Sequence, residues 1–381
     1  MNLKRTNQNV ISEWWWTIDR FLIALVFILI FCGVVLNLAA SPAVANRLGL
    51  DQYYFVKRHF IFLVPSIITM ILCSFLSQKN IRRICLLTFL SCILIMLYLN
   101  FFGTPIKGAT RWLDLWVISL QPSEFAKPAF IVLISWFFSE SLVTNKPGKL
   151  ISLILYIILI SLLISQPDYG QTILITMVSI LIYFIAGMPW IGILVVFIIS
   201  IIGSAVAYLN VDHVAQRLNS YLNPSSGDTF QVDTAHNAII KGGWLGKGPG
   251  EGTIKNILPD AHTDFIFAVA AEEYGIFICM LIVLLFAFIV LRGFQRAMLN
   301  QDIFSRLSIA GLSSMIGIQS GINIGVNLGI IPAKGMTLPF ISYGGSSMLS
   351  IAIAFGFMLA FSRKKASNRI LFVNKYSREL N

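Results

Sequence analysis

The stretch FLIALVFILIFCGVVLNLAA, residues 21–40, decides the fold class, because it carries no charged side chain along its whole length. A helix of about 20 apolar residues is long enough to cross roughly 30 Å of hydrocarbon. A secretory signal peptide is the alternative, since SPAVAN at 41–46 resembles a cleavage site. The apolar run exceeds the roughly 7–15 residues of a signal sequence, which favours a retained first transmembrane helix.

The rest of the chain repeats this pattern. Of its 381 residues, 57% are hydrophobic and 12% are charged, and the mean hydropathy is +0.80, whereas soluble domains are about 25% charged. We therefore predict an all-α, polytopic membrane protein. Ten apolar runs are expected to form its transmembrane helices: 18–40, 60–77, 84–102, 124–142, 150–165, 171–187, 190–209, 264–291, 304–330 and 338–361.

The basic residues predict the orientation, because Lys and Arg concentrate in cytoplasmic loops. Most of the 28 basic residues lie in the 1–17 tail, in alternate loops and in the 362–381 tail. Both termini are therefore expected in the cytoplasm, flanking a transmembrane domain over 18–361. The long loop 210–263, between the seventh and eighth helices, is then extracytoplasmic. This asymmetry accounts for the net charge of +11 without nucleic-acid binding.

Several simple sites are not expected. KGGWLGKGPGEG at 241–252 indicates tight turns or close backbone approach rather than a packed domain, and no GxxxxGK[ST] motif supports nucleotide binding. The four histidines lack metal-ligand spacing, so no preformed metal site is predicted. The five cysteines lie in or beside apolar runs and imply no disulfide framework.

Ionisable residues within apolar runs are functional hypotheses, since one charge at mid-bilayer costs about 2.5–3.5 kcal/mol. Glu124 and Lys127 are three residues apart, on one helical face. They either form a neutral pair that fastens the helix end or shape a polar cavity. Asp168, in QPDYG, either forms an Asx turn or pairs with Lys127 across the bundle.

ILPDAHTDFIFAVAAEEYG, residues 257–275, runs from a polar loop into an apolar helix. Thr263 and Asp264 stand where an N-cap is expected. Alternatively, the helix dipole favours an ionised Asp264 while desolvation opposes it, a combination suited to a general base. Glu272 and Glu273 lie about 12–13 Å deeper and are expected to pair within the bundle.

Four motifs together resemble the SEDS proteins, the FtsW/RodA family of cell-wall polymerases. They are GATRWLDL…SLQPSEFAK (108–127), QPDYGQT (166–172), GGWLGKGPGEG…LPDAHTDFIFAVAAEEYG (242–275) and PAKGMTLPFISYGGSS (332–347). The resemblance follows the same order along nearly the whole chain. The last motif is more similar to the division branch, FtsW, than to the elongation branch, RodA. GPGEG departs from the GLG-like pattern that is usual in the loop.

The resemblance implies a peptidoglycan glycosyltransferase of the bacterial inner membrane that polymerises lipid II, at the division septum and with a periplasmic active site. Asp264 would be the essential aspartate and Trp112 the functional tryptophan. Glu124, Lys127 and Asp168 would line the central cavity. His262, Ser342 and Tyr343 match motif positions and receive no chemical step. Three cations are candidates to neutralise the departing diphosphate: Lys107, Arg111 and Lys334.

The implied partners are lipid II, membrane lipid, a cognate class B penicillin-binding protein and other division proteins, but no nucleic acid. Any divalent cation, Mg²⁺ or Mn²⁺, would be held largely by substrate phosphates. Three rival functions are an elongation polymerase of the RodA type, a flippase that uses the buried charges as a proton relay, and a scaffold for the transpeptidase. One-sided polar motifs and the lack of inverted repeats argue against the flippase.

Overall fold

The computed structural model describes residues 10–104, 110–115, 118–144, 147–187, 230–332 and 335–363, with isolated positions between 189 and 209. Within this part the regular secondary structure is helical apart from one small antiparallel sheet, β1 (Leu113–Leu115) with β2 (Ile118–Leu120). The α-helices are α1 (Val10–Thr17), α2 (Arg20–Arg47), α3 (Tyr54–Ser74), α4 (Gln78–Phe102), α5 (Pro122–Thr144), α6 (Gly148–Ser165), α7 (Tyr169–Ile185), α10 (Phe230–Gly242), α11 (Ile266–Met298), α12 (Ile303–Asn327) and α13 (Gly345–Phe361).

The described part contains seven helices that are long and apolar enough to cross a membrane, namely α2, α3, α4, α5, α6, α11 and α12. Two shorter apolar helices, α7 and α13, also match predicted spans. The predicted span 190–209 lies mostly outside the described residues. The chain is a multi-pass membrane protein, and the count of ten spans stays a prediction.

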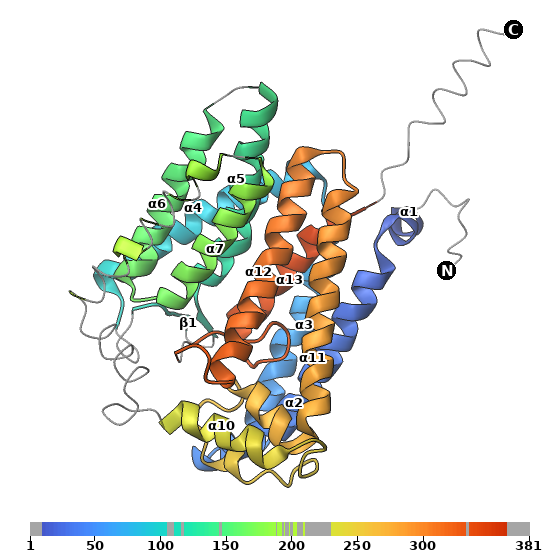
Figure 1. The fold of residues 1–381 in the computed structure, drawn as a ribbon, viewed down its shortest axis with the longest axis vertical. Coiled ribbons are helices and arrows are strands. Elements are labelled where there is room, and N and C mark those ends of the chain that lie inside the picture. Colours follow the sequence, from blue (N-terminus) through green and yellow to red (C-terminus); the bar gives the residue numbers. More distant parts are fainter. Residues whose placement is uncertain are drawn as a thin grey trace, which may run out of the picture.

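Helices α5 and α12 form the centre of the bundle. The most apolar windows of α5 and α12 are 72% and 78% buried, against 28% for α3, α4 and α6. In Figure 1, α12 separates a group of α4 to α7 from a group of α2, α3, α11 and α13. Gly311 permits close packing here, because a Cβ at this position would lie 2.8 Å from Ile131 and 2.6 Å from Ile182.

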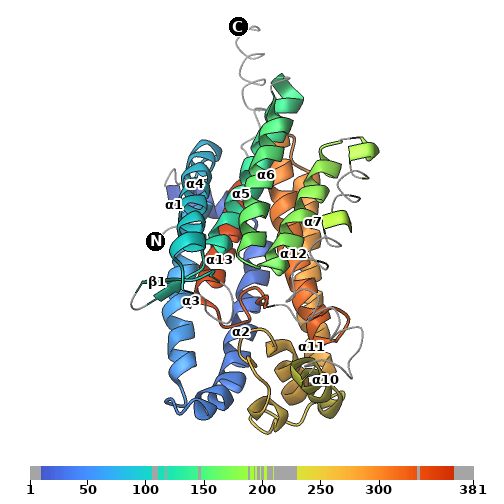
Figure 2. The same cartoon turned by 90° about the vertical axis from the view of Figure 1, so that its left-hand side faces the viewer.

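The loops that were predicted to share the cytoplasmic side meet at one end of the bundle. Asp19 caps α2 and pairs with Arg292 at 2.9 Å and with Arg296, both near the end of α11. Arg363, just after α13, donates to the Thr17 hydroxyl at 3.2 Å. Helix α10 lies at the opposite end (Figure 2). The side of the membrane that each end faces stays a prediction.

The glycine-rich loop before α11 was predicted to form tight turns or to allow close backbone approach, and the structure confirms the close approach. The helix α10 in this loop was not predicted. Helix α10 packs along α11, and a Cβ on Gly242 would lie 1.9 Å from the Ala271 carbonyl. The glycines therefore allow a helix to dock rather than merely turning the chain. Residues 210–229 lie outside the described part.

Two helix starts were also predicted too early. Helix α11 begins at Ile266 rather than 264, and α13 begins at Gly345 rather than 338. Helix α11 continues to Met298 and bends at Gly275, whose φ of 80° and ψ of 178° are not helical. The non-helical residues before α11 and α13 form the walls of the candidate site.

Candidate active site

Asp264 lies in a tight turn, not at the helix cap. The Asp260 carbonyl accepts hydrogen bonds from the amides of Thr263 and Asp264, both at 3.1 Å, and Asp260 itself has a φ of 51°. The N-cap of α11 is Phe265, which makes no side-chain capping bond. The N-cap position predicted at Thr263 and Asp264 was therefore wrong, because the structure places the N-cap at Phe265. The Asp264 side chain is half-buried.

The backbone of Asp264 is fixed by two amide side chains of α12. Asn323 and Asn327 donate to the Asp264 carbonyl oxygen at 2.9 and 3.0 Å. The carboxylate points toward the chain after α12, since a Cβ on Gly335 would lie 3.3 Å from Asp264 Oδ2. Any larger residue at Gly335 would narrow the space in front of the carboxylate.

His262, Tyr343 and Phe55 of α3 form an aromatic cluster beside this turn. The His262 ring lies 4.4 Å from Phe55 and 5.2 Å from Tyr343, and Phe55 and Tyr343 are 5.5 Å apart, all between ring centroids. The Tyr343 amide donates to the His262 carbonyl at 2.9 Å, which joins the two motifs. Burial raises the pKa of Tyr343, and Arg58, which hydrogen-bonds the hydroxyl, opposes that rise.

Ser342 closes the turn before α13. Its hydroxyl accepts from the Leu338 amide at 2.8 Å, and its own amide donates to the Leu338 carbonyl at 2.9 Å. Phe340 in this turn has a left-handed φ of 58°, a conformation that side chains rarely adopt. Ser342 is buried and bonded to backbone, so its position indicates a role in holding the turn rather than in contacting a substrate.

Glu124 and Lys127 form a buried ion pair on α5. Lys127 Nζ lies 2.9 Å from Glu124 Oε2, and both side chains are at most 5% exposed. Gln171 of α7 donates to the other Glu124 oxygen at 2.6 Å, and Lys127 donates to Gln319 Oε1 of α12 at 3.2 Å. The pair predicted from the spacing is confirmed, and its surroundings are three packed helices.

Asp168 pairs with Arg111, so the predicted pairing with Lys127 was wrong. The guanidinium lies 3.5 Å from Asp168 Oδ1 and also donates to the carbonyls of Gln166 and Pro167. The reason is proximity, since the loop after α4 folds over the turn between α6 and α7. Gln121 donates to the other Asp168 oxygen at 3.2 Å. Burial raises the pKa of Asp168, and Arg111 opposes this effect.

The remaining predicted residues divide into two cases. Trp112, beside Arg111, is 37% exposed and is available to a ligand or to the membrane surface. Lys334 and Lys107 lie outside the described residues. Among the residues that the structure does describe, no group of three or more His, Cys, Asp or Glu side chains is placed to hold a metal ion.

Glu272 and Glu273 secure the loop that leads to Asp264. The Glu272 carboxylate accepts from three consecutive amides, those of Thr253, Ile254 and Lys255, at 2.7, 2.7 and 3.0 Å. The Lys255 ammonium pairs with Glu273 and donates to the Ala39 carbonyl of α2 at 3.2 Å. Their internal pairing was expected, although the partner is the loop rather than another membrane helix.

Comparison with known proteins places these motifs in one family. The model of the FtsW/RodA/SpoVE family, described as "Cell cycle protein", matches residues 19–367. The chain belongs to this family. A "Probable peptidoglycan glycosyltransferase FtsW" of Caulobacter vibrioides is 45% identical over 363 residues, covering 95% of this chain and 93% of the relative. A protein of the same description from Geobacter metallireducens is 34% identical and covers 91% and 96%.

Solved structures share the fold of this family member. Thermus thermophilus RodA superposes with a TM-score of 0.67 at 24% identity, over 91% of this chain and 97% of the other. A chain from a structure described as "Structural coordination of polymerization and crosslinking by a peptidoglycan synthase complex" reaches a TM-score of 0.75, with the same identity and coverage.

Sequence reasoning missed the amide side chains that organise the site. Gln319, Asn323 and Asn327 recur every four residues within the apolar helix α12. That spacing places them on one helical face, and a search for polar residues at this period would have found them. Arg58 was missed for a different reason, because nothing in the sequence indicates that α3 packs against the turn with Tyr343.

Proposed function

We propose that the protein is a peptidoglycan glycosyltransferase of the division type, which polymerises lipid II with Asp264 as the general base. One observation carries the proposal: the Asp264 carboxylate is half-buried on a backbone held by Asn323 and Asn327, and it faces the open position at Gly335. The relatives named FtsW, of which one is 45% identical, support the division branch over the elongation branch.

In the proposed reaction, Asp264 accepts the proton of the 4-hydroxyl of an acceptor lipid II. The oxygen then attacks the anomeric carbon of the lipid-linked glycan, and undecaprenyl diphosphate leaves with inversion to give a β-1,4 link. A base must lie within hydrogen-bond reach of the proton that it takes, and a carboxylate fixed by its own backbone is suited to this. Trp112 and the cations Arg111 and Lys334 are proposed to contact the substrate.

Positive charge near the diphosphate would stabilise the leaving group. Arg58 is a further candidate, since it hydrogen-bonds Tyr343, whose ring contacts His262. A divalent cation remains part of the proposal, held mainly by the substrate's own phosphates. We further propose that the end with α10 faces the periplasm at the septum and that a class B penicillin-binding protein is the partner.

The test is lipid II polymerisation by the purified protein with its cognate class B transpeptidase. Asp264→Asn should abolish polymer while leaving the complex intact on co-purification. Asp260→Asn is the matched control, because that residue holds the same turn through its backbone carbonyl and Asn tolerates its positive φ. Equal polymer from wild type and Asp264→Asn would remove Asp264 from the mechanism. No polymer from an intact wild-type complex supplied with divalent cation would favour a flippase or a scaffold.

A further inference from the structure

One face of α12 connects the Glu124–Lys127 ion pair to the turn that contains Asp264. Gln319, Asn323 and Asn327 are each at most 1% exposed. Besides holding the Asp264 carbonyl, Asn323 donates to the Met336 carbonyl at 2.6 Å, and Gln319 donates to the Thr337 carbonyl at 3.0 Å. Asn327 Oδ1 accepts from the Ala268 amide in the first turn of α11 at 3.1 Å. The same face therefore fixes both walls of the site, the turn with Asp264 and the segment after Gly335.

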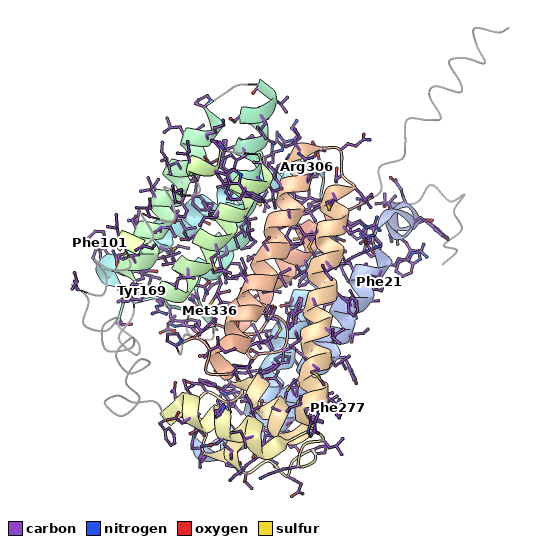
Figure 3. The ribbon with its side chains drawn as sticks, in the orientation of Figure 1. Phe21, Phe101, Tyr169, Phe277, Arg306 and Met336 are labelled. Atoms are coloured by element: carbon purple, nitrogen blue, oxygen red, sulfur yellow. The ribbon has the colours of Figure 1, made fainter. Side chains whose placement is uncertain are left out.

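Figure 3 labels one residue near the start of α12 and one beside its second half. Arg306, near the start of α12, lies at the end of the bundle away from α10, whereas Met336 lies nearer α10, beside the second half of α12. The amide residues belong to that second half, Gln319 to Asn327. The face thus runs along α12 from the ion pair on α5 toward the turn with Asp264.

The ion pair decides which way the Gln319 amide points. A lysine ammonium can only donate hydrogen bonds, whereas an amide offers one accepting oxygen and a donating nitrogen. Because Lys127 donates to Gln319 Oε1, the Gln319 nitrogen is turned toward the Thr337 carbonyl. Glu124 in turn fixes the Lys127 ammonium at 2.9 Å. Two charged groups, Lys127 and Glu124, therefore set the orientation of the Gln319 amide, and neither of them is the Asp264 carboxylate.

Direct binding of a substrate phosphate by Lys127 fits the geometry less well. The Lys127 side chain is 1% exposed, and its ammonium contacts both Glu124 and Gln319. A phosphate would have to displace Glu124 and leave a buried carboxylate without its counter-charge, which is strongly unfavourable.

We infer that Glu124, Lys127 and Gln319 are positioning residues for Asp264: the buried ion pair orients Gln319, and the amide face of α12 holds the Thr337 and Asp264 segments at a fixed separation. The inference rests on the proposed function. It assigns these residues an effect on the catalytic step rather than on substrate affinity.

The experiment compares three variants by initial rates of lipid II polymerisation over a range of lipid II concentrations. Gln319→Met removes the donor to Thr337 and adds no charge. Glu124→Gln/Lys127→Met removes the ion pair without leaving a lone charge. The third variant combines the double change with Gln319→Met, so that no variant leaves an unpaired buried charge. Ser320→Ala is the matched control, since Ser320 is buried on the same helix and bonds only its own turn at Gly317.

Each of the first two variants should lower kcat by about 10- to 100-fold, the loss expected when a catalytic group is misplaced by about 1 Å, and KM should change less than about twofold. The combined variant should be no slower than the worse of the two, because residues acting through one path are not additive. A raised KM with unchanged kcat, or losses that multiply, would overturn the inference. If the double variant fails to fold, Gln319→Met carries the same test. Loss of polymer in Asp264→Asn establishes the proposed function independently of these variants.

Discussion

Gly33 of α2 controls the position of the turn before α13, although it lies far from Asp264 in the sequence. A Cβ on this residue would lie 2.2 Å from the Phe340 carbonyl oxygen and 3.0 Å from Ile341 Cα. Real Cβ contacts are essentially never shorter than 3.0 Å, so Gly33→Ala requires a displacement of at least about 0.8 Å. Asn37, one helical turn later, holds the same turn by donating to the Ile341 carbonyl at 2.6 Å.

The size of the effect of Gly33→Ala depends on the overpacking itself and on the residues that this turn positions. Overpacking of this kind costs about 1–3 kcal/mol of unfolding free energy. The turn also positions Tyr343, whose amide bonds His262, two residues before Asp264. A shift of about 1 Å in a catalytic arrangement lowers the rate by up to about 100-fold. We therefore expect Gly33→Ala to lose both stability and polymerisation rate.

The assay measures the unfolding midpoint in detergent together with the lipid II polymerisation rate. Gly321→Ala is the control, because a Cβ on this α12 glycine meets nothing within 4 Å, and it should be neutral or slightly stabilising. Asn37→Ala removes the hydrogen bond to the Ile341 carbonyl of the same turn without adding bulk. It should lower the unfolding free energy by a smaller amount, about 0.5–1.5 kcal/mol. An unchanged midpoint and rate in Gly33→Ala would refute the argument from packing.

Three further predictions concern the Lys255–Glu273 ion pair, the protonation of Asp168 and the bend of α11 at Gly275. Glu273→Gln leaves the Lys255 ammonium buried without its counter-charge and should lower the unfolding free energy by about 3–5 kcal/mol. Most of that loss should be recovered in Lys255→Met/Glu273→Gln, and no recovery would contradict the pairing. Because burial raises the pKa of Asp168 above 3.8, its contribution to stability should fall as the pH rises from about 3.8 through the folded-state pKa. In chemical unfolding, the free energy of wild type minus that of Asp168→Asn should therefore fall over this window, and a difference that rises with pH would be inconsistent with the raised pKa. Gly275→Ala combines a φ of 80° with a Cβ 2.3 Å from the Trp244 carbonyl. It should lower the unfolding free energy by about 1–3 kcal/mol, so its unfolding midpoint should lie below that of Gly321→Ala. Equal midpoints would show that the bend in α11 tolerates a side chain.

The charged pairs show how far spacing alone can predict contacts. Glu124 and Lys127 share one helical turn, so their pairing follows from helix geometry and was predicted. Asp168 pairs with Arg111, which lies on a different loop, and no local rule selects that partner over Lys127. Spacing therefore predicts contacts within an element but not between elements.

The amide face of α12 also shows that spacing does not predict contacts between elements. Its four-residue period is present in the sequence, but which backbone groups the amides hold depends on how α11, α12 and the segment after Gly335 pack together. Similarly, Thr263 and Asp264 have the composition of an N-cap, yet the left-handed Asp260 completes a turn first and moves the helix start to Ile266.

The sequence by itself determined the mainly helical membrane architecture, the positions of most spans, the family and the candidate residue Asp264. These properties depend on local composition, periodicity and short motifs, because an apolar run of sufficient length must satisfy its own backbone hydrogen bonds in hydrocarbon. Only the tertiary structure decided that α10 docks on α11, that Arg111 takes Asp168, and that Gln319 connects the ion pair to the Asp264 turn. These contacts join residues far apart in the chain, and their selection depends on the three-dimensional fit of glycines, carbonyls and amides.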